Sequence, residues 1–414
     1  MNKFKHKLLF VVMGWLVANA SFAAGGVTLC DTLAGGPYDP NKVAEGVEIT
    51  SINVSQAEPA CKDALASDPA NPRLQFEYGR VFAAKGDYAS AMIWYTKAAD
   101  QNYAPALNNI GLLFYNGNGV QTDLSKAYEW FLKSANLNYA VAQENVGFSY
   151  LYGEGVAINL AKSFEWFLKA ANQNYASAQN NVGYSYETGE GVQKDLSKAF
   201  EWYLKAANQD YTLAQRHLAR LYYNGQGVAK DLAKAFEWNL KAANLNDASA
   251  QNEVGYAYEI GEGVGLDYKK ALEWYQKAAE GGEPLGYLNV GALYHNGLVS
   301  DKNELKALAA WRKASDMNFA EATFEIILSW AEQTYPTWLP DFAFATPPRL
   351  PAPYANYSYR NYRSAAGDIF VAYNPDDRHI YYLGPATANS VVDLGVIDNF
   401  KQAAYDWAVT KLGS

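Results

Sequence analysis

A 36-residue periodicity dominates this sequence of 414 residues. Six tryptophans recur at this interval, and so do five glycines whose register is completed by Ala219. The tryptophans are Trp94, Trp130, Trp166, Trp202, Trp238 and Trp274, and the glycines are Gly111, Gly147, Gly183, Gly255 and Gly291. A period of about 20 to 50 residues is typical of a solenoid, in which each repeat buries its apolar face only against its neighbours. We therefore expect the function of this chain to lie in what its surface binds.

Each repeat reads as two helices joined by a glycine turn, and residues 106–136 show the pattern. Apolar or small residues three or four positions apart predict a first helix with one buried stripe. They are Leu107, Ile110, Gly111 and Phe114. The segment from Gly117 to Val120 then ends this helix, because glycine adopts left-handed turn conformations without steric cost. Asp123 is placed to cap a second helix, in which Trp130 is expected to fill the wider part of the interface between the two helices.

This pattern resembles the Sel-one-like repeat (SLR) family, a relative of the tetratricopeptide repeat (TPR). The shared features are a first helix of the LGxLY type, a GxGV turn and a KAxxWxxKAA second helix, and they cover about residues 72 to 317. The resemblance implies an all-α, right-handed α-solenoid of about seven SLR- or TPR-like repeats. Residues 72–104 depart from it, because their turn is Lys85-Gly86-Asp87-Tyr88, and they look closer to a plain TPR. Six SLR repeats are expected over residues 105–317.

The first 23 residues read as a secretory signal peptide. Three lysines precede an apolar run from Leu8 to Ala18, and cleavage is expected near Ala23, with Ala20 as a second possible point. The apolar run is too short to span a bilayer, and no later stretch reaches the ~20 apolar residues that a membrane helix needs. We therefore expect an exported chain, periplasmic or secreted, that does not span the membrane.

Residues 24–71 are expected to cap the N-terminal end of the array. They contain two cysteines, Cys30 and Cys61, which should form a disulfide in an oxidising compartment, the alternative being two free buried thiols. Ser55 to Glu58 has the spacing of a capping box, which predicts that the helix carrying Cys61 begins there.

Three segments follow the array. A closing helix is expected at residues 318–335, and six prolines between Pro336 and Pro353 predict an extended linker at residues 336–356. Residues 357–414 read as a small α+β unit. Its expected elements are a hairpin of strands 368–373 and 379–383, a third strand at 391–396 and a helix at 399–412.

Charge and motifs disfavour nucleic acid binding and catalysis. The formal net charge is −9 and becomes −12 once residues 1–23, with three lysines and no acidic residue, are removed. A surface that tracks phosphates needs the opposite sign. The GxGV turns follow helices rather than strands, so they are not nucleotide loops. The sequence contains no HExxH, CxxC, GxSxG, Walker or SxxK motif.

No catalytic residue, cofactor site or metal site is therefore predicted. His217, His295 and His379 lie apart in sequence and lack the neighbouring ligands of a metal site. A cysteine-rich branch of the SLR superfamily is associated with β-lactamase activity. Its members carry a cysteine pair in most repeats, whereas the repeats of this chain have none, so we do not transfer that activity.

Three variable rows on the first helices form the candidate partner-binding face. They stand three residues before, one residue after and four residues after the periodic glycine, a spacing that places them on one side of the helix. Tyrosine, asparagine and arginine suit recognition, because they combine contact area with adaptable hydrogen bonds. The predicted residues are Asn108, Tyr115, Phe148, Asn180, Tyr184, Arg216, His217, Arg220, Tyr223, Asn252, Tyr256 and His295.

The alternative for these rows is that they are solvated positions, with some aromatic rings packing between neighbouring repeats. The cluster of Arg216, His217 and Arg220 stands out in an acidic array. It either receives an acidic segment of a partner or pairs with Glu187 and Glu259 of the adjacent repeats.

The resemblance implies a non-enzymatic scaffold, adaptor or regulator in the cell envelope that binds a protein or peptide through its concave helix face. Two alternatives remain. One is a cell-wall or β-lactam hydrolase in which Glu187, Glu259 and His295 act as acid and base. The other is a glycan-binding module. The sequence leaves the oligomeric state and the identity of the partner open.

Overall fold

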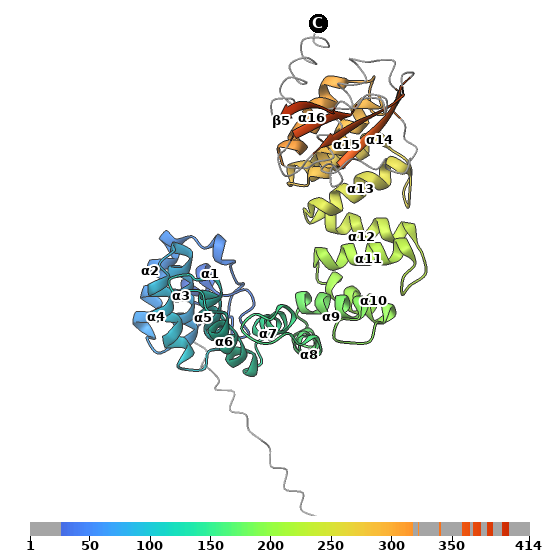
Figure 1. Ribbon diagram of the computed structural model, residues 1–414. Helices are drawn as coiled ribbons and strands as arrows, with labels where there is room; N and C mark the ends of the chain where they lie inside the picture. The colour runs from blue at the N-terminus through green and yellow to red at the C-terminus, as the bar shows by residue number, and fades with distance from the viewer. Residues whose placement is uncertain are drawn as a thin grey trace, which may run out of the picture. The chain divides into compact units, whose positions relative to one another are not determined.

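The computed structural model describes residues 26–317, Ala322 and five strands between residues 339 and 396 (Figure 1). The predicted signal peptide, most of the closing helix at 318–335 and the helix at 399–412 lie outside the described residues. The chain divides into two compact units, Met1–Lys194 and Asp195–Ser414, and each is described by itself.

The first unit is helical throughout its described residues. A short 3-10 helix, η1, covers Ile49–Ser51. The α-helices are α1 Leu29–Ala34, α2 Val54–Ser67, α3 Pro72–Lys85, α4 Tyr88–Ala99, α5 Ala104–Asn116, α6 Leu124–Asn136, α7 Ala140–Tyr152, α8 Leu160–Ala171 and α9 Ala176–Thr188. From α3 to α9, each helix packs against the next one along the chain.

The second unit continues this pattern and then changes to strands. Its helices are α10 Leu196–Ala207, α11 Thr212–Asn224, α12 Leu232–Asn244, α13 Ala248–Ile260, α14 Tyr268–Glu280, α15 Pro284–His295 and α16 Glu304–Asp316. Its strands are β1 Leu339–Pro340, β2 Ser358–Ser364, β3 Gly367–Tyr373, β4 His379–Leu383 and β5 Val391–Val396. Successive helices pack against one another from α10 to α16. The prediction of an α-solenoid is confirmed.

Caps at both ends of each turn set the helix boundaries. The side chains of Asp123, Asn159, Asp195, Asp231, Asp267 and Asn303 accept a hydrogen bond from the backbone N–H three residues later. Each satisfies one of the backbone donors that a helix leaves free at its start. The first helices α5, α7, α9, α11 and α13 end at glycines in the left-handed conformation, such as Gly117 and Gly153, whereas α15 ends at Asn296. The predicted turn chemistry is therefore confirmed.

The periodic glycine lies against an aromatic ring of the second helix. A Cβ atom at Gly111 would stand 2.6 Å from ring atoms of Phe131, and one at Gly255 would meet Tyr275 at the same distance. The ring that fills this space belongs to the residue after the tryptophan, as in Phe131, Phe167 and Tyr275, and the expectation for Trp130 is wrong. Trp130 is half-buried, and the ammonium of Lys133 lies 4.2 Å from its ring centre.

This cation–π pair recurs in every repeat from α4 to α14. The Lys Nζ atom lies 3.7 to 4.2 Å from the ring centroid of the tryptophan three residues earlier. The lysines are Lys97, Lys133, Lys169, Lys205, Lys241 and Lys277. Each pair contributes about 0.5 to 1 kcal/mol at a partly exposed site. The tryptophan row is therefore covered from outside by charged side chains.

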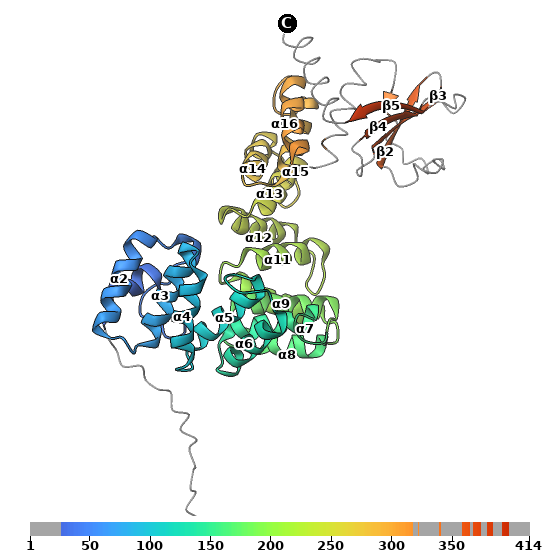
Figure 2. The same ribbon diagram turned by 60° about the vertical axis from the view of Figure 1, so that its left-hand side comes forward.

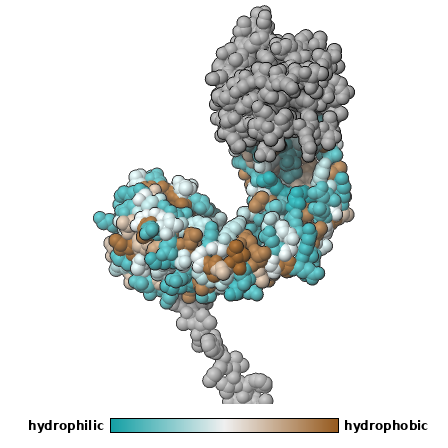
Figure 3. Space-filling model, viewed as in Figure 1, coloured by the Kyte–Doolittle hydropathy of each residue, from teal (hydrophilic) through white to brown (hydrophobic). Residues whose placement is uncertain are grey.

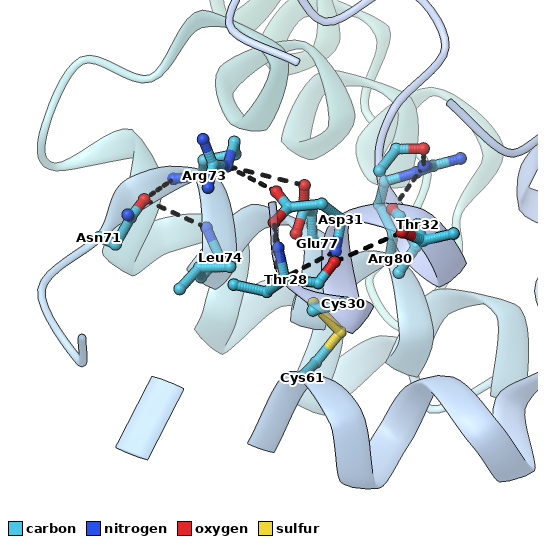
Figure 4. The surroundings of a disulfide bond; sticks show 12 residues. Thr28, Cys30, Asp31, Thr32, Cys61, Asn71, Arg73, Leu74, Glu77 and Arg80 are labelled. Carbon is cyan, nitrogen blue, oxygen red and sulfur yellow. Dashed lines mark hydrogen bonds and ion pairs between the residues drawn. A yellow bond between two sulfur atoms is a disulfide. The ribbon is translucent and has the colours of Figure 1, made fainter. Parts of the chain in front are cut away.

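A disulfide holds the N-terminal segment together, as predicted. Cys30 of α1 is bonded to Cys61 of α2, and both side chains are fully buried (Figure 4). The capping box is not where the sequence suggested. Helix α2 begins at Val54 after Asn53, whereas Thr28 and Asp31 form a capping box at the start of α1. The Thr28 side chain accepts from the backbone N–H of Asp31, whose carboxylate accepts from the N–H of Thr28.

Buried charges connect this segment to α3. Arg73 pairs with Asp31 at 2.8 Å, and Arg80 donates to backbone carbonyls of Ala34, Gly35 and Val47. Glu77 lies beside Arg73 and is 1% exposed. Burial, reinforced by the neighbouring Asp31 carboxylate, raises the pKa of Glu77 to about 9.

The C-terminal strands form one antiparallel sheet in the order β1-β2-β3-β4-β5 (Figure 2). The predicted hairpin is present, with Phe370 opposite Leu383 and Tyr373 opposite Ile380, and the strand at 391–396 is present as β5. Strand β2 was not predicted. Strand β1 includes Pro340 and lies at the sheet edge, where a missing N–H is tolerated.

Candidate partner-binding face

The first helices carry the predicted face. In the first unit these are α5, α7 and α9, and in the second unit they are α11, α13 and α15. The structure separates the predicted residues into exposed, half-buried and buried ones.

The asparagines of the predicted face are buried, which corrects the prediction for them. Asn108 is 2% exposed, Asn180 is 4% exposed and Asn252 is 6% exposed. These asparagines expose almost no surface to a partner, and none of them lines the hollow between α7, α8 and α9. The three residues therefore leave the proposed face, and Asn108 and Asn252 accept hydrogen bonds from the next repeat.

A polar ladder between repeats explains their burial. Asn145 of α7 donates from Nδ2 to Oδ1 of Asn108 in α5 at 2.8 Å. The same contact recurs from Asn289 of α15 to Asn252 of α13 at 2.9 Å. At the corresponding positions of α9 and α7, Asn181 donates to the carboxylate of Glu144 at 2.8 Å. Burial raises the pKa of Glu144 to about 7. Asn108, Glu144 and Asn252 thus each accept a hydrogen bond from the first helix of the next repeat.

The predicted tyrosines are exposed. Tyr115 and Tyr184 of the first unit and Tyr223 and Tyr256 of the second are between 37% and 46% exposed. The prediction missed Tyr152, one position beyond the third row, which is 63% exposed and stacks on Phe148 with their ring centroids 6.0 Å apart. Phe148 itself is half-buried. We use the name tyrosine face for these exposed positions within each unit, which are Tyr115, Tyr152 and Tyr184 in the first unit and Tyr223 and Tyr256 in the second.

Two of these tyrosines are held by the turn of the next repeat. The hydroxyl of Tyr115 donates to Oε1 of Glu154 at 2.9 Å. Tyr223 interacts with the equivalent carboxylate, Glu262, and this interaction raises the pKa of the Tyr223 phenol. The bond to Glu154 restricts the direction of the Tyr115 ring, which remains 37% exposed. A ring held in this way loses little conformational freedom when a partner binds.

Two residues of the basic cluster of α11 contact other helices of the second unit. Arg216 Nε lies 3.8 Å from the carboxylate of Asp247, and the His217 ring stacks on Tyr203 at 4.6 Å. Arg220 contacts His217 at 3.4 Å and is exposed. Arg220 is therefore the member of this cluster best placed to meet an acidic group of a partner.

Two of the three residues of the hydrolase alternative, Glu259 and His295, are tied into their own repeats. Glu259 accepts a hydrogen bond from the Tyr275 hydroxyl at 2.5 Å. His295 is half-buried, and its Nδ1 lies 2.9 Å from the Glu304 carboxylate. Among residues 26–317, no group of three or more His, Cys, Asp or Glu side chains is arranged to hold a metal ion. Nor does any helix in the described part of the chain have the length and apolarity to cross a membrane.

Apolar residues gather over the stretch from α7 to α9, as the brown surface of Figure 3 shows. Phe148 contributes to this stretch, with its ring 5.0 Å from that of the buried Phe167. Within this stretch, Tyr152 and Tyr184 line the same hollow as the apolar residues Phe148 and Leu151.

Comparison with known proteins identifies the repeat. The family model described as the Sel1 repeat matches seven consecutive segments, which together make up more than half of the chain. They are residues 76–103, 104–139, 140–175, 176–211, 212–247, 248–283 and 284–319. The first segment, residues 76–103, falls within residues 72–104, whose sequence looks closer to a plain TPR. No curated protein matches the chain significantly.

Two solved structures share both the fold and substantial identity. One is a protective antigen of uropathogenic Escherichia coli strains that displays an SLR fold, 31% identical over 68% of this chain with a TM-score of 0.58. The match covers 60% of the antigen, so this chain spans less than two thirds of that relative. The other is a Sel1 repeat protein from Oxalobacter formigenes, 34% identical, with a TM-score of 0.55, covering 58% of this chain and 99% of that protein. The chain belongs to the Sel1 repeat family.

Proposed function

We propose that this protein is an exported, non-enzymatic scaffold of the cell envelope that binds a protein partner through its tyrosine face. Sel1 repeat proteins are in general protein-interaction scaffolds, and their helical solenoid is typically non-catalytic. The observation that carries the proposal is the exposure of tyrosines at recurring positions of the first helices. Tyrosine is enriched at recognition surfaces because a rigid ring and a hydroxyl act together.

Location in the envelope is supported by two features. The N-terminal sequence has the three parts of a secretory signal, and a disulfide such as Cys30–Cys61 persists in oxidising compartments. Arg220 adds a positive charge beside Tyr223, so an acidic segment of a protein fits this part of the face.

Photo-crosslinking tests the proposal. A photoreactive amino acid replaces Tyr184 or Tyr256 in the full chain, and in control variants it replaces Glu165 or Glu273, which are exposed on second helices. We expect discrete covalent adducts with a protein at the tyrosine positions and none at the glutamate positions. Equal adducts at both kinds of position, or none at the tyrosines, would remove the tyrosine face as the binding surface.

Turnover assays test the absence of catalysis. Purified mature protein is incubated with a chromogenic β-lactam and with peptidoglycan, and product is followed over hours. We expect no turnover above that of buffer. Turnover that is lost in a Glu259→Gln or His295→Asn variant would establish the hydrolase instead.

A further inference from the structure

A hollow of about 400 Å³ lies between α7, α8 and α9 of the first unit. Phe148, Leu151 and Tyr152 of α7 form one wall, and Tyr184 of α9 forms part of the opposite wall. Ser163 of α8 and Glu190, in the turn that follows α9, also line it. Two members of the tyrosine face therefore stand at the edge of a site large enough to hold one aromatic side chain.

Comparison of this hollow with the equivalent positions of other repeats shows what is different about it. In the preceding repeat, Tyr115 stands at the position that corresponds to Leu151, and its phenol donates a hydrogen bond to Glu154. Two repeats later, Tyr223 stands at the equivalent position and interacts with Glu262. At the hollow the tyrosine is replaced by Leu151, which has no hydroxyl, while the turn glutamate is retained as Glu190. Within residues 26–317, no side chain donates a hydrogen bond to the Glu190 carboxylate.

A second substitution places a hydroxyl inside the hollow. The position of Ser163 is alanine in the repeats on either side and in the three that follow, at Ala127, Ala199, Ala235, Ala271 and Ala307. Ser163 is 2% exposed, and its Oγ has no hydrogen-bond partner among the described residues. An unpaired buried hydroxyl costs about 1 to 3 kcal/mol of stability. A ligand that pairs with it recovers this free energy only when bound.

We propose that this hollow binds a tyrosine side chain of the protein partner, in place of the tyrosine that the repeat itself lacks. The inference rests on the proposed function and adds the chemistry of one contact. The ring of the partner residue lies among Phe148, Tyr152 and Tyr184. Its hydroxyl donates to Glu190, as Tyr115 does to Glu154, and accepts from Ser163.

Charge sets the specificity of the site. Its lining includes the carboxylate of Glu190 and neither lysine nor arginine. A phosphorylated tyrosine or a carboxylate ligand would meet like charge with no compensating cation, which is unfavourable at close range. A phenylalanine would fill the space but leave Glu190 and Ser163 without partners. A neutral phenol satisfies both groups.

A titration of the full mature chain with blocked tripeptide amides tests the proposal. The peptides are glycine-tyrosine-glycine, its phenylalanine analogue and its phosphotyrosine analogue, with N,N′-diacetylchitobiose as the carbohydrate probe. Binding is followed by ligand-observed NMR. We expect saturable binding of the tyrosine peptide, at least about fivefold weaker binding of the phenylalanine peptide, because both hydrogen bonds of the hydroxyl are lost, and weaker binding still of the phosphotyrosine peptide.

Two variants place the binding in this hollow. Leu151→Tyr rebuilds the arrangement of Tyr115 and Glu154, so the chain's own phenol should fill the site and abolish peptide binding. Ser163→Ala restores the residue of the other repeats and should weaken binding about threefold to tenfold. Leu245→Tyr, at an exposed leucine of the second unit, is the matched control and should bind the peptide like the wild type.

Three results would overturn the inference. They are equal binding of the tyrosine and phenylalanine peptides, undiminished binding by a folded Leu151→Tyr variant, and tighter binding of the disaccharide than of the tyrosine peptide. The last would assign the hollow to a glycan. None of them touches the crosslinks expected at Tyr256 in the other unit, so the tyrosine pocket can fail while the scaffold function stands.

Discussion

Gly155 of one repeat lies directly against the backbone carbonyl of Leu124 in the repeat before it. Its φ angle is +74°, a conformation that favours glycine, and a Cβ atom here would overlap the Leu124 oxygen. Gly191, Gly227 and Gly263 make the same approach to Leu160, Leu196 and Leu232. The second glycine of each GxGV turn is therefore a contact between repeats, as well as a turn residue.

We predict that Gly155→Ala destabilises the first unit by about 3 kcal/mol or more, because it combines an unfavourable φ with a backbone overlap. Gly86→Ala is the matched control. Its φ is +82°, yet no atom lies within 4 Å of an added Cβ, so only the conformational cost of about 1 to 2 kcal/mol remains. Urea unfolding of both variants measures the difference. Equal losses of stability would show that Gly155 does not fasten the repeats.

Loss of the disulfide should loosen the N-terminal cap. The bond closes a loop with a sequence separation of 31 residues, which corresponds to about 3 to 4 kcal/mol in the loop-entropy description. In a Cys30→Ser, Cys61→Ser variant we expect faster amide hydrogen exchange in α1, α2 and α3, whereas α11 to α14 of the second unit keep their protection. Uniform loss of protection along the chain would contradict a local role for the bond.

The buried Glu77 should make the cap pH-sensitive. Its folded pKa of about 9 lies above the ordinary value of 4.5, so between these values the folded state holds a proton that the unfolded state has released. The contribution of Glu77 to stability is therefore fully present below pH 4.5 and is lost as the pH rises towards 9. Glu77→Gln removes this titration. We expect it to stabilise the protein by about 1 to 3 kcal/mol more at pH 8 than at pH 5.

Denaturation midpoints of wild type and Glu77→Gln at these two pH values check the prediction. Asp39 of the same segment also has a raised pKa, chiefly through burial, and is present in both proteins, so its effect cancels in the comparison. A gain from Glu77→Gln that does not depend on pH would mean that Glu77 is not protonated when folded.

The repeat period predicted most of the fold because it is a consequence of packing. A glycine required every 36 residues marks a close helix contact, and a capping Asp or Asn marks each second helix. Periodicity did not distinguish Trp130 from Phe131, since both are aromatic and adjacent. The structure resolves them, because only Phe131 points at Gly111, while Trp130 lies at the surface under Lys133.

The binding face was harder to predict, because polarity does not reveal burial. Asn108 reads like a surface residue until its partner Asn145, in the next repeat, is seen. A glutamine that recurs in the repeats is buried as well. Gln143 and Gln179 donate to carbonyls of Ala135 and Ala171 at the ends of preceding helices, a role that the sequence did not indicate. The signal that was available and missed is Ser163, a serine in a row of alanines.

Replacing a buried polar residue and replacing an exposed one distinguish the stacking of the repeats from the binding of a partner. Asn108→Ala leaves the half-buried amide of Asn145 without its acceptor and a gap at a buried position, so we expect a loss of about 1 to 3 kcal/mol in the free energy of unfolding. The crosslink yield at position 184 should not change under conditions where the variant is folded.

Tyr256→Ala removes a ring that is 46% exposed, so stability should change by less than about 0.5 kcal/mol. Partner affinity should nevertheless fall by about tenfold or more, as for a buried aromatic contact in an interface. The opposite result, lost binding in the asparagine variant and normal binding in the tyrosine variant, would return the asparagine row to the binding face and remove the tyrosines from it.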